Sequence, residues 1–268
     1  MQTTSALYRS ILADSNHWFE VSVVIGNSGD LITEDGDIIL FGGTAIIVAR
    51  DSPDSGFFEE QLFSVSTSQH MFDDDPALGK AVAAEIEVKM LNPAGELPTM
   101  GLLTPYVRVR NDTQVSEWIQ QGVFYIDTRY VTHNSNGLDI LTLHGFDAML
   151  MADQYWQDTG HLNWSSGTVL DTAMVSEIAR IIDVRVDERT WDIMTDAFRI
   201  PPPTNYTLRD VLGYIAGAYA GTFIMTDIGE LRLVSITDLP EETSLLIDAA
   251  GDYITFGGDR IKLVDTIG

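Results

Sequence analysis

The chain contains no cysteine, few basic residues and no long apolar run. Without cysteine it can form neither disulfides nor thiolate metal sites, which suits folding in a reducing cytoplasm. A run of about 18 apolar residues would be needed for a membrane-spanning helix, so none is predicted. The N-terminal stretch MQTTSALYRSILADSN lacks the basic start and apolar block of a signal peptide, so secretion is not expected.

Basic residues are scarce relative to acidic ones. Fifteen Lys and Arg face forty Asp and Glu, which gives a formal net charge of −25 over 268 residues. Binding to DNA phosphates needs clustered positive charge, and no basic run is present. Specific nucleic-acid binding is therefore not expected. An acidic surface of this kind favours solubility or adaptation to salt.

The apolar content of 45 % is enough for a real core and for one large or two modest domains. Short apolar or alternating segments separated by turn residues predict a β-rich first domain over residues 1–150, a tube-like barrel or sandwich of roughly seven or more strands. A short helix capped by Ser5 precedes them. The predicted strands include Phe19–Ile25, Ile38–Phe41, Ala45–Ala49, Phe63–Ser68, Ala83–Met90 and Tyr106–Arg110.

The stretch Gly122–Leu150 predicts a β-hairpin followed by a helix. Phe124, Ile126 and, less strictly, Tyr130 are spaced for one face of a strand. The polar sequence His133–Gly137 ends in Asn-Gly, which is typical of a hairpin turn. The strand pattern then resumes, and Asp147 begins a helix.

Residues 151–245 predict a small α+β domain of two helices and a hairpin. Val169–Ile182 carries an apolar stripe with Ser166 or Thr168 as its cap, and a second helix begins at a capping box from Thr207 to Asp210. A short strand, Val184–Val186, lies between them. The Pro-rich stretch Ile200–Asn205 must be extended.

Glycines recur every four residues at Gly213, Gly217 and Gly221. The apolar run around them is too short for a membrane helix pair, so close packing of a helix on a sheet is predicted. The hairpin Thr222–Ile236 follows and completes the small domain.

No catalytic, cofactor-binding or metal site is predicted. The nearest approach to a metal cluster is His70 with Asp73–Asp75, which fits a solvated acidic loop better. The pair of His144 and Asp147 fits a structural hydrogen bond better than catalysis. Leu31–Gly42 fails as a calcium loop because Leu and Gly stand where the first and last ligands belong. A catalytic pair of carboxylates among the forty acidic residues is an alternative that the sequence leaves open. No nucleophile elbow or phosphate-binding loop occurs.

Several of these segments together carry a family resemblance. The arm GVFYIDT…LTLHGFDAML resembles the end of the first β-domain of siphophage and prophage tail hub proteins, also called tail-tip or tail-associated proteins. The resemblance covers nearly the whole chain but contains no catalytic signature. Further segments that carry it are Phe63–Met90, Thr104–Thr128, Tyr206–Ile236 and Ala249–Ile261.

The resemblance implies a structural role in the tail tip of a virion, after synthesis in the bacterial cytoplasm. Such hubs are homotrimers whose two similar β-domains form a pseudo-sixfold ring between the distal tail protein ring and the tip. Expected partners are therefore the distal tail protein, the tape-measure protein and a tail fibre or receptor-binding protein. DNA would pass through the ring, and a negative lumen would keep it from sticking.

Two alternatives stay open beside the structural role. One is a carboxylate-dependent hydrolase of the tail tip, since some related proteins carry the label prophage endopeptidase tail. The other is a glycan- or receptor-binding module with Trp156 and Trp164 as stacking platforms, although packing beneath a loop suits these tryptophans better.

Two segments repeat each other. Asp37–Val48 and Asp252–Leu263 align without gaps and share an Asp, Ile, Phe, Gly, Gly, Ile pattern. The match is either chance or the mark of two related β-domains, the second beginning within residues 246–268. Proteins of the resembled family continue beyond this point, so a truncated second domain is expected.

Overall fold

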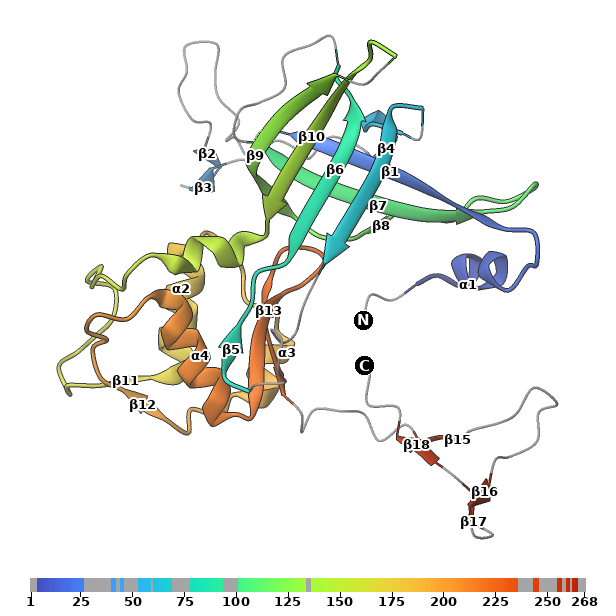
Figure 1. Ribbon diagram of the computed structural model, residues 1–268. Helices are drawn as coiled ribbons and strands as arrows, with labels where there is room; N and C mark the ends of the chain where they lie inside the picture. Colours follow the sequence, from blue (N-terminus) through green and yellow to red (C-terminus); the bar gives the residue numbers. More distant parts are fainter. Residues whose placement is uncertain are drawn as a thin grey trace.

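The computed structural model describes residues 4–26, 40–41, 44–45, 53–58, 60–68, 78–93, 101–133, 136–235, 243–245, 255–256, 259–260 and 262–264. Its described part forms a β-sheet unit and a smaller unit of helices and short strands, joined side by side (Figure 1). Antiparallel strands dominate, so the predicted mainly β, α+β class is confirmed.

The β-sheet unit is one seven-stranded sheet. Its strand order is β1-β7-β9-β10-β6-β4, with β8 added on β7, and every neighbouring pair in it is antiparallel. Strands β1 and β7 pair over nine residues and cross the β6–β10 layer in Figure 1. The strands are β1 (Trp18–Gly26), β4 (Leu62–Ser68), β6 (Glu85–Leu91), β7 (Leu102–Arg110), β8 (Ile119–Gln120), β9 (Phe124–His133) and β10 (Asp139–Phe146).

The core of this unit follows from strand alternation. Ile86, Val88 and Met90 point to one face of β6 and are almost completely buried, as their spacing predicted. Residues of four other strands join them: Val23, Leu103, Phe124, Ile126, Leu141 and Leu143. The sheet therefore bends around a single apolar core, to which both of its layers contribute.

Barrel closure is the part of the first prediction that the structure does not bear out. In the described residues β1 and β4 are the two ends of the sheet and do not pair with each other. Helix α1 (Ala6–Leu12) precedes the sheet, and the Ser5 hydroxyl accepts the backbone N–H of Tyr8, as predicted for its cap.

The smaller unit packs helices against a three-stranded sheet. Strands β13 (Gly221–Met225) and β14 (Leu231–Ser235) form the predicted hairpin, and β5 (Lys80–Ala81) adds in parallel to β13. Residues 80–81 belong to the predicted first domain, so the chain enters the smaller unit twice. The other elements are η2 (a 3₁₀ helix, Ala148–Asp153), α2 (Asp171–Ile181), α3 (Arg189–Ile193), α4 (Leu208–Ala218) and the pair β11 (Val169–Leu170) with β12 (Arg199–Ile200).

Helix α4 confirms its predicted start. The Thr207 hydroxyl accepts the N–H of Asp210, and the Asp210 carboxylate accepts the N–H of Thr207. Gly213 and Gly217 face Gly79, beside β5, as close helix-on-sheet packing predicted. Gly221 lies in β13 rather than in the helix.

Three local predictions in this half need correction. Helix α2 starts at Asp171 without a side-chain cap from Ser166 or Thr168, because β12 holds Val169 and Leu170 extended. Val184–Val186 is not a strand and makes only a bridge from Val186 to Leu231. The helix after Asp147 is a single 3₁₀ segment, with Asp147 as its cap.

The two copies of the repeat are described only in part. Leu40–Phe41 (β2) pairs with Thr44–Ala45 (β3), and Thr255–Phe256 (β16) pairs with Asp259–Arg260 (β17). Corresponding residues of the two copies thus make the same short antiparallel pairing across a Gly-Gly dipeptide. Strands β15 (Thr243–Leu245) and β18 (Lys262–Val264) also pair, η1 (Pro53–Ser55) is a short 3₁₀ helix, and most of residues 246–268 lies outside the described residues.

Candidate assembly surface

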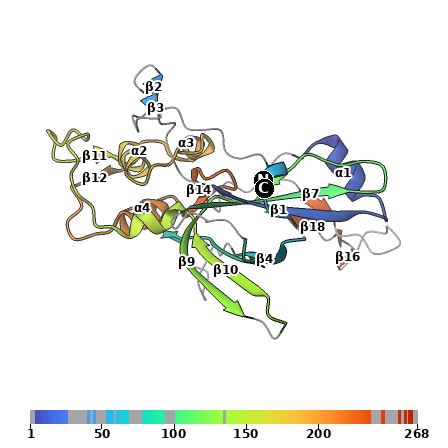
Figure 2. The same cartoon turned by 90° about the horizontal axis from the view of Figure 1, so that it is seen from above.

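The β9–β10 hairpin projects away from both units (Figure 2). Phe124 and Ile126 are buried in the sheet, whereas every residue from Asp127 to His133 is exposed. A register shift between His144 and Gly145 places two residues of β9 opposite one of β10 and bends the strand there. The predicted inward position of Tyr130 is therefore wrong, and its side chain is 51 % exposed.

The projecting part of β9, residues 127–133, is named here the outer arm. β9 pairs with β10 along the arm but with β7 only at Phe124 and Tyr125. Among the described residues, no strand borders the other side of Tyr130–Thr132. An exposed strand edge of this kind is a template for pairing with another chain.

A second open edge is that of β4, the strand at one end of the same sheet. Strand β4 pairs with β6 and, within the described residues, with no other strand. Phe63 on β4 is 55 % exposed, and Val131 on the outer arm is 44 % exposed. The outer arm, on an interior strand of the sheet, and β4, at one end of it, are thus two open strand edges with exposed apolar side chains.

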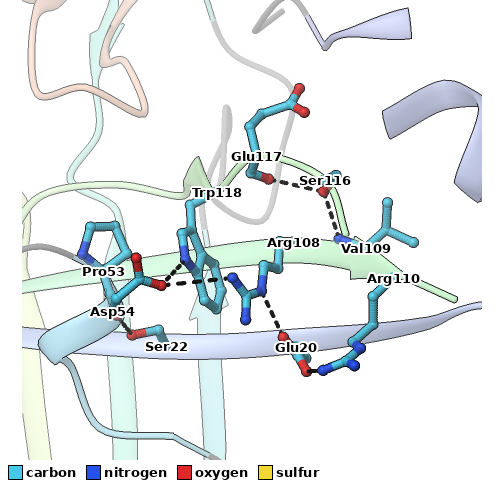
Figure 3. Close-up of polar contacts among 10 residues, drawn as sticks. All are labelled: Glu20, Ser22, Pro53, Asp54, Arg108, Val109, Arg110, Ser116, Glu117 and Trp118. Carbon is cyan, nitrogen blue, oxygen red and sulfur yellow. Dashed lines mark hydrogen bonds and ion pairs between the residues drawn. The ribbon is translucent and has the colours of Figure 1, made fainter. Parts of the chain in front are cut away.

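The opposite margin of the sheet carries a charged cluster centred on Glu20 of β1 (Figure 3). Its carboxylate accepts hydrogen bonds from Arg108 Nε at 2.6 Å and Arg110 Nη1 at 2.5 Å, both on β7. The Arg108 guanidinium lies 4.1 Å from the ring centroid of Trp118, and the Trp118 indole N–H donates to Asp54. Because two of the few arginines are neutralised here, the cluster fastens β1, β7 and η1 rather than forming a basic patch for phosphate.

Burial acts to raise the pKa of Glu20, but the hydrogen bonds from Arg110 and Arg108 outweigh it and the net shift is downward. Sequence reasoning did not single out this cluster. The signal was available in the alternation of FEVSV and YVRVR, because antiparallel pairing sets Glu20 directly opposite Arg108.

A small polar cavity of about 120 Å³ lies where the two units meet. It is lined by two carboxylates, Asp147 and Asp227. Burial raises the pKa of Asp147 to about 6, against the effect of the N–H bonds from Ala84 and Met149, and burial also raises the pKa of Asp227. Both Asp147 oxygens already accept backbone N–H groups, so this carboxylate holds structure rather than awaiting a substrate.

The larger hollow is an open groove of about 390 Å³ between α4 and the Pro201–Pro203 segment. The described residues of its lining are almost entirely apolar or aromatic, and Asp171 is the one charged residue among them. Sequence reasoning read the Pro-rich segment only as extended chain. Proximity of that segment to α4 depends on the β11–β12 pairing, which has no local signature.

The other candidate residues adopt structural positions. Trp156 and Trp164 form an edge-to-face pair at 6.4 Å and pack on the core of the smaller unit, as the sequence favoured. His144 meets Phe146 edge to face, and its Nε2 lies 3.7 Å from a Glu85 carboxylate oxygen, whereas Asp147 bonds to backbone N–H groups instead. His70 and Asp73–Asp75 lie outside the described residues, as does most of Leu31–Gly42.

Among the residues that the structure describes, no group of three or more His, Asp and Glu side chains could hold a metal ion. Within the same residues, every helix is too short or too polar to cross a lipid bilayer.

Comparison with known proteins gives similarity of structure only. No protein-family model matches the chain, and no curated protein matches it. The chain is similar in structure to the 43 kDa tail protein of prophage MuSo2 from Shewanella oneidensis, with a TM-score of 0.46 and 10 % identity over 87 % of this chain. It is also similar to the tail protein from Neisseria meningitidis MC58, with a TM-score of 0.40 and 16 % identity over 88 % of this chain. The chain spans 64 % and 62 % of the lengths of these two proteins.

Proposed function

We propose that this chain is a structural, non-catalytic component of a phage or prophage tail. In this role it is a subunit of the hub ring that links the distal tail ring to the tip. The projecting outer arm carries the proposal, because an open strand edge with exposed apolar side chains serves assembly. The sequence resemblance of five segments to tail hub proteins points to the same role.

The assembled form in this proposal is a homotrimer. A heterologous contact between the outer arm of one subunit and β4 of the next would satisfy both open edges and can close into a ring. The net charge of −25 suits a lumen through which DNA slides without binding. The ring would contact the distal tail protein, the tape-measure protein and a tail fibre or receptor-binding protein.

The solution mass of the chain tests this role. Light scattering at several protein concentrations should give three times the mass of one chain, and electron microscopy of the same sample should show closed rings. A monomer at the highest attainable concentration would contradict the hub role for this chain.

A further inference from the structure

The groove beside α4 is framed by aromatic side chains. Tyr206 and Tyr214 meet edge to face with ring centroids 5.4 Å apart, and Phe198 and Tyr219 do so at 5.2 Å. Tyr214 is 66 % exposed and lies on the solvent-facing side of α4, whose other face is buried. Exposed aromatic rings gathered around a hollow are more typical of an interaction site than of a surface that contacts only solvent.

The scaffold of the groove is rigid. Its outer wall is the Pro201–Pro203 segment, whose ring-fixed φ angles leave little conformational entropy to lose on binding. Its floor is α4, with Val211 and Ile215 buried against the core of the smaller unit. A volume of about 390 Å³ lies within the usual range for sites that take small ligands or a few side chains.

Charge decides which occupant fits the groove. Among the described residues of the lining, Asp171 is the one that carries a charge, and it is completely buried. Its carboxylate accepts hydrogen bonds from the Tyr219 hydroxyl, at 2.5 Å, and from the backbone N–H of Thr172. In the described residues no Lys or Arg forms an ion pair with it. A negative charge behind electron-rich ring faces attracts a cation and repels an anion.

We propose that this groove binds a short apolar peptide segment of another protein that carries one Lys or Arg side chain. The apolar part of the segment fills the space between α4 and the prolines. Its cationic group sits over the tyrosine rings, toward the Asp171 end. This binding site does not depend on the outer arm or on ring formation.

Three peptides that differ in one side chain test the proposal. They are acetyl-Phe-Arg-Leu-amide and its counterparts with citrulline or Glu in place of Arg. Each is titrated into the full chain labelled with ¹³C at isoleucine δ1 methyl groups. Ile200 and Ile215 line the groove and should shift, whereas Ile228, on the turn between β13 and β14, should not.

The Arg peptide should bind at least about fivefold more tightly than the citrulline peptide, as expected for one desolvated cation–π contact, and the Glu peptide more weakly still. The preference for Arg over citrulline should persist in 0.5 M salt. At this salt concentration the screening length lies between about 3 and 10 Å, so the general attraction to the acidic chain is screened. Tyr214→Ala should weaken the Arg peptide about fivefold. Tyr130→Ala, a matched exposed tyrosine on the outer arm, should leave binding unchanged.

Asp171→Asn should reduce the preference for Arg over citrulline. If that variant does not fold, Tyr214→Ala and the three peptides still test the proposal. Equal affinity of all three peptides would overturn the choice of a basic occupant. Absence of shifts at Ile200 and Ile215 would overturn the peptide site. Shifts of these methyls that depend only on protein concentration would instead identify a second copy of the chain as the occupant, against the proposal.

Discussion

Asp147 and Ala84 exchange two hydrogen bonds across the junction of the two units. The Asp147 N–H donates to the Ala84 carbonyl at 3.0 Å, and the Ala84 N–H donates to the Asp147 carboxylate at 2.8 Å. Ala84 lies where the chain passes from β5 to β6, and Asp147 lies where it passes from β10 to η2. Asp147 therefore links the two points at which the chain passes between the units.

The pKa of Asp147 predicts a pH dependence of stability. The folded-state pKa is raised from 3.8 to about 6, so the folded chain holds this proton more tightly than the unfolded chain. The corresponding stabilisation is complete below about pH 3.8 and is lost as the pH rises through about 6, with a size on the order of 2–3 kcal/mol. A carboxyl ¹³C titration should give a midpoint near 6.

A comparison of variants isolates this effect from other titrating groups. The free energy of unfolding of the wild type should exceed that of Asp147→Asn by a larger amount at pH 4.5 than at pH 7.5. Asp127→Asn, at an exposed position on the outer arm, should show no such trend. A midpoint near 4 for Asp147 would contradict the prediction.

Glu177 on α2 predicts the opposite trend. Hydrogen bonds from Arg180, with help from the Thr159 hydroxyl, overcome burial and lower the pKa of Glu177 to about 2. Its stabilisation is present above the unfolded value of 4.5 and is lost as the pH falls from there through about 2. Glu177→Gln should cost about 1–3 kcal/mol in urea unfolding at pH 6.

The same variant also tests what holds the 155–168 loop. Thr159 belongs to this loop, so Glu177→Gln should speed its proteolysis as well. Glu60→Gln, at an exposed position, is the control and should change neither property. An unchanged unfolding free energy for Glu177→Gln would show that the pair with Arg180 is only a surface contact.

Local patterns predicted what local physics decides. The alternation of Ile86, Val88 and Met90 and the capping box of Thr207 were correct because a strand face and a helix cap each depend on a few neighbouring residues. The exposed position of Tyr130 was not predictable from spacing. It follows from the extra residue of β9 opposite His144 and Gly145 of β10, a bulge that the pattern of a single strand does not reveal.

Long-range pairing explains the remaining differences. Helix α2 lacks its predicted cap because Val169–Leu170 pairs with Arg199–Ile200 about 30 residues later along the chain. The same pairing brings Pro201–Pro203 to α4 and so creates the groove. Sheet closure likewise depends on how far the strands twist and on which edges meet. Neither can be predicted from the short strand patterns.

Charge on the outer arm should separate assembly from folding. Tyr130→Lys combined with Val131→Lys places two cations on the open edge of β9, where lysine opposes pairing with another strand. Because both side chains are exposed, the free energy of unfolding should change by less than about 0.5 kcal/mol. Light scattering should show the trimer replaced by monomer.

The matched control for this test is Tyr155→Lys, which changes an exposed tyrosine outside the β-sheet unit. It should keep the mass of the wild type. A trimer that survives both lysines on the outer arm would show that the ring is built from another surface, and β4 would be the next edge to test.

Two glycines of α4 should respond to alanine with opposite signs. A Cβ on Gly213 would lie 2.8 Å from the Gly79 carbonyl oxygen, whereas a Cβ on Gly217 would lie 3.4 Å from the Gly79 Cα, an ordinary contact. Alanine inside a helix gains about 1 kcal/mol over glycine, but overpacking against backbone costs about 1–3 kcal/mol. Gly79 cannot easily retreat, since its N–H is bonded to the Gly221 carbonyl. Gly217→Ala should therefore raise the unfolding midpoint in urea and Gly213→Ala should lower it, and equal midpoints would show that α4 and β5 are not in close contact in solution.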